Sequence, residues 1–379
     1  HVSVVPPMDY NSRTTADSVV SRLGGRASMC GRVVLVTGSN SGIGLETAVA
    51  LAMTSAVVIC AARTKEKCAR AIATVGRRSR CQPSQLRAAV FDLGSLAEVS
   101  SWAQRYAASG RPLHVLINNA GVMQLPTFVP TADGFESQFG INFLAPWLLT
   151  RLLLPVLQRS AEASASADSA SSSVPVLSRV VNVSSIAHRH LDLAKLSVKR
   201  LPLGARTYSS WDAYASSKLL QIVHAQRVGR DRSYPLVGAI AVHPGVVKTG
   251  LGRHQARNPA SYTWWIYNAA PVMSVLGMGH KSAAAGAAPS VRAAMDDSLL
   301  ASCDGAVLGG ASSWLYLDEK CRPAVPRLPG TAALGGGGGS GRYLLGEQLD
   351  ARAEALCAAA ATPQRGRRRT GRRRPRAKL

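Results

Sequence analysis

The sequence predicts a doubly wound α/β fold, in which helices cover both faces of one parallel sheet to make three layers. Short apolar, β-branched runs alternate with helix-forming stretches over residues 32–242. A glycine-rich segment joins the first run to a helix, and polar residues follow later runs where each one ends. This alternation is typical of parallel sheets, because parallel strands need crossover helices between them.

Each expected strand is a short, almost wholly apolar run, as strands buried on both faces require. The stretches between them carry apolar residues at helical spacing. The expected strands are 32–37, 57–60, 86–91, 113–117, 179–184 and 237–242, with a late strand near 314–317. The expected helices are 45–53, 65–74, 96–107, 135–157 and 214–227.

The segments outside this alternation differ in composition and set the expected domain limits. Residues 1–30 are mixed and polar, and we expect an N-terminal arm there. A single domain is expected over 31–322, with a flexible insertion at the low-complexity stretch 160–173. Beyond it, 323–379 is rich in Pro, Gly, Ala and Arg, which predicts a mostly disordered basic tail.

The chain is strongly basic. Its formal net charge is +24, and nine of the positive charges lie in residues 365–378. Such a balance fits an anionic cofactor, a nucleic acid, a membrane surface or simply a biased composition. The tail has no interleaved aromatic residues, so we expect it to be solvated; nucleic-acid binding by counterion release is the alternative.

Cysteine and histidine usage gives little sign of a disulfide framework or a metal site. The seven cysteines have no CxxC spacing, which favours free thiols in a reduced intracellular compartment. His188, His190, His243 and His254 lack acidic partners at ligand spacing, so we expect surface or loop histidines and no metal.

The sequence contains no run of about 18 apolar residues, so we expect no transmembrane helix. The chain begins at His1 rather than Met, so the sequence does not exclude a targeting segment ahead of it.

The glycine-rich segment TGSNSGIG, residues 37–44, has the features of a phosphate loop. Gly38 allows a tight turn, Gly42 lets the backbone approach a pyrophosphate, and Gly44 lets helix and sheet pack closely. The following helix offers unpaired N–H groups to the phosphates. A Rossmann-type dinucleotide site is therefore predicted, with an ordinary glycine turn as the alternative. The expected contacts are Gly38, Ser39, Asn40, Ser41, Gly42, Ile43 and Gly44.

The end of the second strand indicates which dinucleotide binds. An acidic residue there would bind the ribose 2′-hydroxyl of NAD, but the segment has Ala61, Ala62 and Arg63 instead. An arginine can hold a 2′-phosphate by two charge-assisted hydrogen bonds. We therefore predict NADP(H), with a solvated loop arginine as the alternative for Arg63.

Tyr214 and Lys218, in the segment YASSK, supply a candidate proton-transfer pair. At a spacing of four residues they share one face of a helix. An adjacent ammonium stabilises a phenolate, which brings a tyrosine closer to acid–base chemistry near neutral pH. The pair alone is weak, but Ser185 and Asn119 end neighbouring expected strands at the sheet edge where ligands bind.

The segments TGSNSGIG, NNAG, NVSS, YASSK and HPGVVKT occur in the order found in the short-chain dehydrogenase/reductase family. The chain resembles that family over about residues 30–320. The resemblance implies that Tyr214 exchanges the proton, Lys218 lowers the Tyr214 pKa and holds the nicotinamide ribose, and Ser185 hydrogen-bonds the substrate oxygen. It further implies that Asn142 anchors a proton-relay water. The other implied cofactor contacts are Asp92, Leu93, Asn119, Ala120, Gly121, Pro244, Gly245, Val247 and Thr249.

The resemblance also indicates a branch of the family. Ser185 and Tyr214 are 29 positions apart, more than in compact members. The longer segment resembles the branch with retinol dehydrogenases, WW-domain oxidoreductases and the chloroplast-envelope translocon dehydrogenase. Residues 143–146 (FLAP) depart from that branch's usual run, which bears on the subgroup and not on the chemistry.

Residues 250–279 are rich in Trp, Tyr and Met, and we expect an apolar substrate lid there. The expected function is interconversion of a carbonyl and an alcohol on a lipophilic substrate such as a retinoid, a steroid or a long-chain aldehyde. The alternative for residues 250–279 is a helix of the core or of a dimer interface. The sequence is also compatible with a homo-oligomer and with a peripheral membrane contact. A non-catalytic NADP(H)-binding sensor or scaffold is the alternative for the chain.

Overall fold

The computed structural model describes residues 10–167, 177–191, 204–247, 251, 281–301, 314–324 and 340–361. Its centre is a seven-stranded sheet in the order β3-β2-β1-β4-β5-β6-β7, and every neighbouring pair is parallel. The strands are β1 (Val33–Thr37), β2 (Val57–Ala62), β3 (Leu86–Val90), β4 (Val115–Asn118), β5 (Ser178–Val183), β6 (Val237–Val242) and β7 (Trp314–Leu317). This sheet confirms the predicted fold class.

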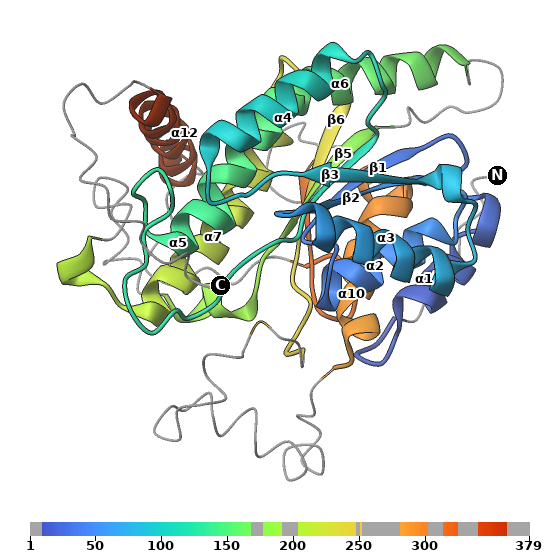
Figure 1. The fold of residues 1–379 in the computed structure, drawn as a ribbon, viewed down its shortest axis with the longest axis horizontal. Helices are drawn as coiled ribbons and strands as arrows, with labels where there is room; N and C mark the ends of the chain where they lie inside the picture. The colour runs from blue at the N-terminus through green and yellow to red at the C-terminus, as the bar shows by residue number, and fades with distance from the viewer. Residues whose placement is uncertain are drawn as a thin grey trace, which may run out of the picture.

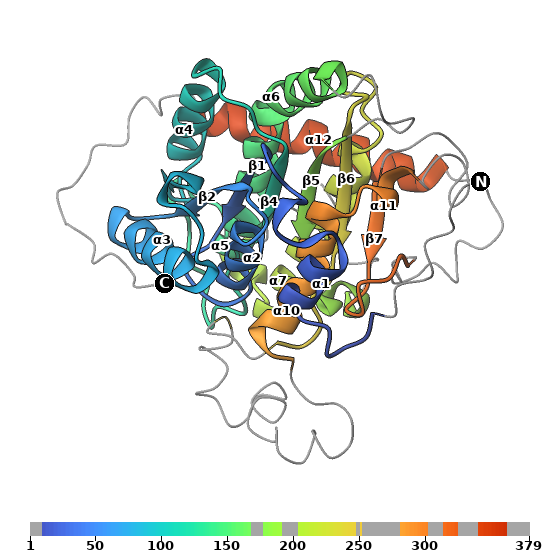
Figure 2. The same ribbon diagram turned by 90° about the vertical axis from the view of Figure 1, so that its right-hand side faces the viewer.

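Helices form a layer on each side of the sheet (Figures 1 and 2). One layer holds α1 (Ala16–Arg22), α2 (Gly42–Ala52), α3 (Lys65–Ser79) and α10 (Ala283–Met295). The other holds α4 (Leu96–Ala108), α6 (Ala145–Ala167) and α7 (Ser210–Val228). Shorter elements are α5 (Ser137–Phe139), α11 (Ser298–Ala301), the π-helical turn η3 (Gly140–Leu144) and the 3-10 turns η1 (Gly25–Ala27), η2 (Pro83–Gln85), η4 (Ile186–His190) and η6 (Ala205–Thr207).

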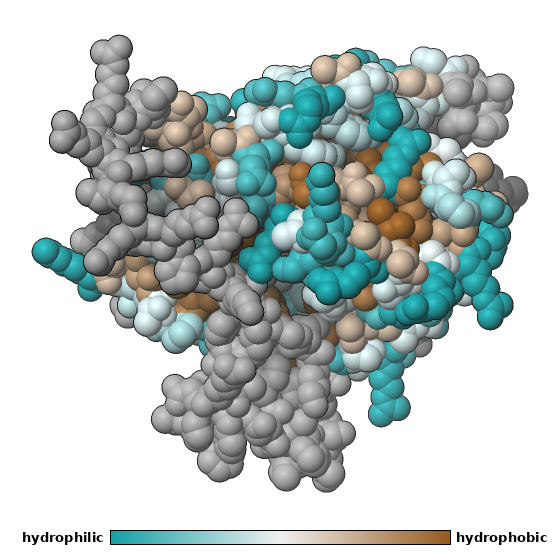
Figure 3. Space-filling view, in the orientation of Figure 1, coloured by the Kyte–Doolittle hydropathy of each residue, from teal (hydrophilic) through white to brown (hydrophobic). Residues whose placement is uncertain are grey.

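The sheet separates two buried cores, because successive side chains of each strand point alternately into one core and into the other. In β1, Val33 and Leu35 pack into the core beneath α4 and α6, while Val34 and Val36 pack into the core beneath α2 and α10. Successive side chains of a strand point to opposite faces, so strands buried on both faces need apolar residues at every position. The helices need only one apolar side, and hydrophilic residues are spread over the face drawn in Figure 3.

The longest helical stretch, Ser137–Ser166, has the length and composition of a membrane span, yet 72% of its most apolar window is buried inside the fold. Its apolar residues belong to the core on the α4 side of the sheet. The helix also runs into the segment expected to be a flexible insertion. That expectation is wrong for 160–167, because α6 continues to Ala167 and the Ser160 Oγ accepts a hydrogen bond from the Leu113 amide at 2.9 Å. Residues 168–173 lie outside the described residues.

The N-terminal arm also differs from expectation. Tyr10 is buried, and α1 packs on α10 through Val19 and Val20. The Thr15 side chain caps α1 by accepting a hydrogen bond from the Ser18 amide. The short apolar face of α1 is enough to join the core, so residues 10–30 belong to the folded domain.

Within the predicted disordered tail the structure has a helix, α12 (Ser340–Ala361). Leu349 and Ala353 are buried against the core on the α4 side, and the Asp350 carboxylate accepts hydrogen bonds from Trp147 Nε1 at 3.0 Å and Arg227 Nε at 2.8 Å. The disorder prediction is wrong for this stretch. The prediction used the average composition of 323–379, but a helix-forming segment lies within it, between a glycine run and an arginine run.

Candidate active site

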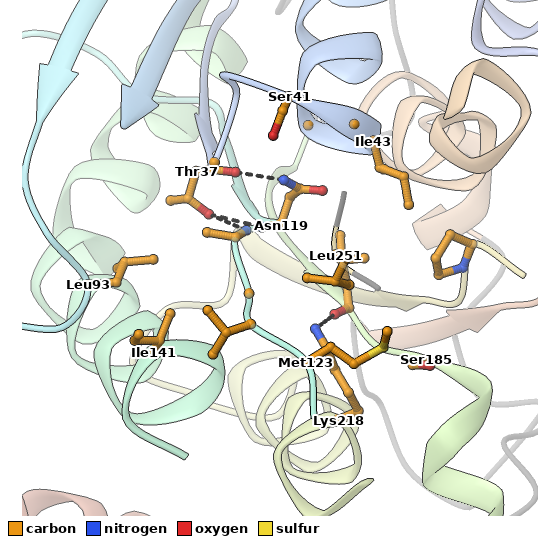
Figure 4. Close-up of a pocket in the computed structure, with 18 of the residues that line it drawn as sticks. Thr37, Ser41, Ile43, Leu93, Asn119, Met123, Ile141, Ser185, Lys218 and Leu251 are labelled. Atoms are coloured by element: carbon orange, nitrogen blue, oxygen red, sulfur yellow. Dashed lines mark hydrogen bonds between the residues drawn. The ribbon is translucent and has the colours of Figure 1, made fainter. Parts of the chain in front are cut away.

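A cavity of about 410 Å³ lies at the edge of the sheet where the strands end, between β1, β4, β5 and α7 (Figure 4). It brings together most of the predicted site residues. Those lining it are Gly38, Asn40, Ser41, Gly42, Ile43, Gly44, Arg63, Asp92, Leu93, Asn119, Ala120, Gly121, Ser185, Tyr214, Lys218, Pro244, Gly245 and Val247. Ser39 and Asn142 do not line it, and Thr249 lies outside the described residues.

The phosphate loop has the backbone that its glycines predict. Gly38 and Gly42 have φ values of +68° and +57°, in the left-handed region that favours glycine. A Cβ on Gly44 would lie 2.3 Å from Asn119 Nδ2 and 2.4 Å from the Gly38 carbonyl oxygen. The loop is therefore a close-packed backbone cradle in front of α2. The Ser39 hydroxyl instead donates to the buried Ala61 carbonyl at 3.3 Å, so its side chain faces the sheet.

Thr37 and Asn119 tie this loop to the end of β4. The Thr37 Oγ1 accepts hydrogen bonds from the Asn119 and Ala120 amides at 3.0 and 3.1 Å, and Asn119 Nδ2 donates to the Thr37 carbonyl at 2.8 Å (Figure 4). The two strands are parallel neighbours, so their ends meet at one edge. The two loops form one rigid wall of the cavity.

Two cations lie at the far end of this wall. Arg63 follows β2, and Lys67, which the sequence analysis did not single out, lines the same cavity from the first turn of α3. The Thr64 side chain caps α3 by accepting from the Lys67 amide at 3.3 Å, which fixes where that turn begins. The signal for Lys67 was a second cation in the first turn of the helix that follows Arg63. The pair makes this end of the cavity suited to a dianionic phosphate.

Tyr214 and Lys218 lie on α7, each only 4% exposed, on the opposite side of the cavity. The Lys218 Nζ donates to the Val183 carbonyl at 2.8 Å and lies 5.9 Å from the centre of the Tyr214 ring. Burial lowers the pKa of Lys218 to about 8, so its ammonium form still prevails at neutral pH. Ser185 follows β5 and lines the same cavity. Three of the four predicted catalytic residues thus line one cavity.

Asn142 lies outside the cavity and supports it. The predicted helix 135–157 contains the π-helical turn η3, and Asn142 is buried within it. Its side chain accepts from the Val122 amide at 2.8 Å and donates to the Val122 carbonyl and Ser217 Oγ, both at 2.9 Å. Gln221 Nε2 donates to its backbone carbonyl. Asn142 thereby joins the cavity wall to α7.

The structure corrects the expectation of surface histidines at two positions, although His243 does lie in a loop, directly after β6. His188 and His243 are buried, at 0% and 1% exposure, whereas His190 is exposed and His254 lies outside the described residues. Burial lowers the pKa of His188 to about 4, so its ring is neutral. Among the described residues no three His, Cys, Asp or Glu side chains group as metal ligands.

Comparison with known proteins gives consistent relatives. The family profile described as short chain dehydrogenase matches residues 32–190. Human retinol dehydrogenase 11 is 38% identical over 241 residues, which cover 63% of this chain and 67% of the relative. Mouse polyprenol dehydrogenase is 36% identical over 249 residues, covering 64% and 68%. The chain belongs to the short-chain dehydrogenase/reductase family.

This short-chain dehydrogenase/reductase has its relatives in the predicted branch, since human retinol dehydrogenase 13 and human WW domain-containing oxidoreductase are each 35% identical to it. The chain spans about two thirds of the length of the first of these, 66% of human retinol dehydrogenase 13. These relatives confirm the predicted family and its retinol dehydrogenase-like branch.

Solved structures share the fold. A putative uncharacterized protein from Mycobacterium paratuberculosis superposes with a TM-score of 0.59 at 27% identity, covering 89% of this chain and 97% of the other. The NADP complex of Pseudomonas aeruginosa RhlG superposes with a TM-score of 0.53 at 24% identity, covering 71% and 91%. Because the profile match ends at residue 190, Tyr214 and Lys218 of this short-chain dehydrogenase/reductase are located by motif and geometry.

Proposed function

We propose that this chain is an NADP(H)-dependent oxidoreductase that interconverts a carbonyl and an alcohol on a lipophilic substrate. One observation carries the proposal: Ser185, Tyr214 and Lys218 line the same cavity as the glycine cradle and Arg63. A protein that only binds the dinucleotide needs the cradle but has no need of a buried tyrosine beside a buried lysine.

The residues present fit a bound NADP(H). The glycine loop lines the cavity at the start of α2, where the first turn of the helix would present its N–H groups to the pyrophosphate. Arg63 and Lys67 would hold the 2′-phosphate, and Asp92 and Leu93 the adenine. Asn119, Ala120 and Gly121 line the cleft between the two ends. Pro244, Gly245 and Val247 would meet the nicotinamide, with Thr249 proposed beside them. The cofactor supplies the hydride.

The chain's own residues supply the proton transfer. The Lys218 ammonium, 5.9 Å from the centre of the Tyr214 ring, would favour the phenolate form of Tyr214, and this phenol would give or take the proton. The Ser185 hydroxyl would hydrogen-bond the substrate oxygen and stabilise negative charge as it develops. Asn142 holds α7 against the cavity wall, and a relay water on its carbonyl would share that oxygen with Gln221.

The substrate end of the cavity is apolar. Met123 lies near Lys218 and Ser185 in Figure 4, and Leu251, a single described residue of the proposed lid 250–279, lines the same end. The other apolar side chains there are Val122, Leu125, Ile186 and Trp211. Relatives named for retinol and polyprenol support a lipophilic substrate. The rest of 250–279, including any dimer or membrane contact that it makes, lies outside the described residues.

The test is NADPH consumption with retinal, steroid ketones and aliphatic aldehydes. We expect turnover, and we expect Tyr214→Phe to lower kcat by about 10²–10⁴-fold while leaving NADPH affinity unchanged. Tyr234→Phe, which removes a phenol hydroxyl outside the cavity lining, is the matched control. Tight NADPH binding without turnover on any carbonyl would favour the sensor or scaffold alternative instead.

A further inference from the structure

The last residue before the Pro244–Val247 loop is a buried histidine that the proposed mechanism does not use. His243 follows β6 and is 1% exposed. Its Nδ1 accepts a hydrogen bond from the Gly245 amide at 2.9 Å, and its Nε2 lies 3.1 Å from Oε2 of Glu319. Because Nδ1 accepts from the amide, the ring N–H is on Nε2, which lies at ion-pair distance from the carboxylate. The ring therefore connects Glu319 to the loop backbone.

Glu319 is supplied by a stiff turn that follows β7. The Asp318 Oδ1 accepts hydrogen bonds from the Lys320 and Arg322 amides, both at 2.9 Å, and the Asp318 amide donates to the Arg322 carbonyl at 3.0 Å. The contact with His243 holds the pKa of Glu319 at about 2, so the carboxylate is charged at neutral pH. A fixed turn can hold a fixed charge against the ring.

Lys281, just before α10, contacts the Pro244–Val247 loop from the other side. Its amide donates to the Val246 carbonyl at 2.9 Å, and its Nζ donates to the Glu319 carbonyl. Gly245 has φ +84°, and a Cβ there would lie 2.9 Å from Lys281 Cδ and 3.2 Å from Glu319 Cβ. The loop thus runs through a narrow gap between the Lys281 and Glu319 side chains, and the Lys281 ammonium also binds the Glu319 backbone carbonyl.

From this geometry we infer that Glu319, acting through His243 and together with Lys281, fixes the Pro244–Val247 loop against the cofactor cavity. Glu319 is then a positioning residue for the nicotinamide end of NADP(H), although it lies outside the cavity and about 75 residues further along the chain. The inference rests on the proposed function for the identity of the ligand. It assigns a role to a residue after β7, far from the sequence motifs that mark the site.

If the contact between Glu319 and His243 is removed, we expect the Pro244–Val247 loop to be less preorganised for the cofactor. Without Glu319 the His243 ring loses the partner that sets its tautomer, and the Gly245 amide loses a fixed acceptor. NADPH must then order the loop as it binds, which costs free energy. Among the described hydrogen bonds, those of Lys218 and Ser185 go to other residues than His243, Glu319 and Lys281. We therefore expect a larger effect on cofactor affinity than on kcat at saturating cofactor.

The experiment measures the NADPH dissociation constant by cofactor fluorescence, together with the KM for NADPH and kcat. We expect Glu319→Ala to weaken NADPH binding by about 10- to 100-fold, with a smaller change in kcat. Glu319→Gln keeps an oxygen that can accept from the ring N–H, and it should restore affinity to within about threefold of the wild type. Glu354→Ala, a surface carboxylate on α12, is the matched control and should bind normally.

A second substitution tests the route through the ring. His243→Asn places an amide oxygen where Nδ1 was, so it can still accept from Gly245, whereas His243→Phe cannot. We expect the Asn variant to bind NADPH more tightly than the Phe variant. Normal affinity in Glu319→Ala, or equal losses in the Gln and Ala variants of Glu319, would overturn the inference.

The binding measurement keeps this inference separate from the proposed function. If Glu319→Ala weakens NADPH binding while the wild type turns over no carbonyl, the positioning role stands and the oxidoreductase proposal fails. If the wild type turns over but Glu319→Ala binds normally, the reverse holds. Denaturant unfolding of each variant shows whether the folded protein was measured.

Discussion

The two ends of the cavity are built in different ways. The phosphate end is backbone from consecutive residues, 37–44, with positive φ at Gly38 and Gly42 and no room for a side chain at Gly44. The catalytic end depends on buried polar side chains from distant segments: Lys218 on α7 lines the cavity, and Asn142 in η3 supports its wall from outside. One end therefore depends on local conformation, and the other on long-range hydrogen bonds.

This difference determines how each end responds to change. Damage to the cradle alters where the dinucleotide backbone can lie, so it should appear as lost affinity. Damage among the buried side chains alters pKa values and orientation, so it should appear as lost turnover or as sensitivity to pH. The predictions below test that division.

The largest effect is expected for Gly44→Ala at the phosphate end. The new Cβ would meet the Gly38 carbonyl oxygen at 2.4 Å and Asn119 Nδ2 at 2.3 Å, and Asn119 is itself bonded to Thr37. Backbone must move, which costs roughly 1–3 kcal/mol of stability and spoils the cradle. We expect NADPH affinity to fall by at least about 100-fold, measured by fluorescence titration.

Gly76→Ala is the matched control for that change. Gly76 lies inside α3, and a Cβ there would make only an ordinary contact, 3.4 Å from Leu86 Cδ1. A helix-interior Gly→Ala change should raise stability by about 0.5–1 kcal/mol and leave NADPH binding alone. Near-normal affinity in Gly44→Ala would show that the loop is not a cradle.

The next effect is acid sensitivity, which should come from three buried histidines. Burial lowers the pKa values of His114, His188 and His224 to about 4, below the ordinary value near 6.5. As pH falls below 6.5 the unfolded chain takes up protons that the folded chain does not. Stability present above pH 6.5 is therefore lost progressively down to about pH 4, by up to about 3 kcal/mol per histidine.

Urea unfolding at pH 7.5 and pH 5 measures this loss. His224 lies on α7 with its Nδ1 3.2 Å from Asn182 Nδ2, and His224→Asn should reduce the difference between the two pH values by about 2 kcal/mol. The same change at the exposed His190 should leave the difference as it is. An equal pH difference in both variants would contradict the assignment of neutral buried rings.

A smaller, more selective effect is expected for Arg63→Ser at the phosphate end. Losing one charge-assisted contact should weaken NADPH binding by about 10- to 100-fold and leave NADH binding nearly unchanged. Competition between the two cofactors measures the ratio directly. An equal loss for both cofactors would place Arg63 on the shared phosphates and remove the support for NADP(H).

The same division explains how far the sequence could be interpreted. The strands, the phosphate loop and the YASSK pair are local patterns, and the structure places them at one sheet edge as expected. The contacts of His243 with Glu319 and of Asn142 with Gln221 join residues about 75 to 80 positions apart. No local spacing indicates such pairs, and the burial of His188 and His243 also depended on the assembled fold.

The helices α1 and α12 were missed for another reason. Each has a short apolar face within a segment whose overall composition is polar or glycine- and arginine-rich. Most helix stability in proteins comes from packing against a neighbour, and a sequence does not show that neighbour. The burial of Leu349 and Val19 appears only when the α4 and α10 surfaces exist.

The smallest predicted effect is at Gly121, the catalytic-end counterpart of Gly44. A Cβ there would lie 3.1 Å from Asn142 Oδ1 and 3.5 Å from Lys218 Nζ, and Gly121 does not have a left-handed φ. The Lys218 contact is an ordinary one, whereas Asn142 Oδ1 is the end of a side chain and must shift by a few tenths of an ångström. Gly121→Ala should fold and bind NADPH within about threefold of the wild type, while kcat falls by about tenfold as Asn142, which is hydrogen-bonded to Ser217 on α7, is displaced. A loss confined to NADPH affinity would show that both ends of the cavity act in the same way.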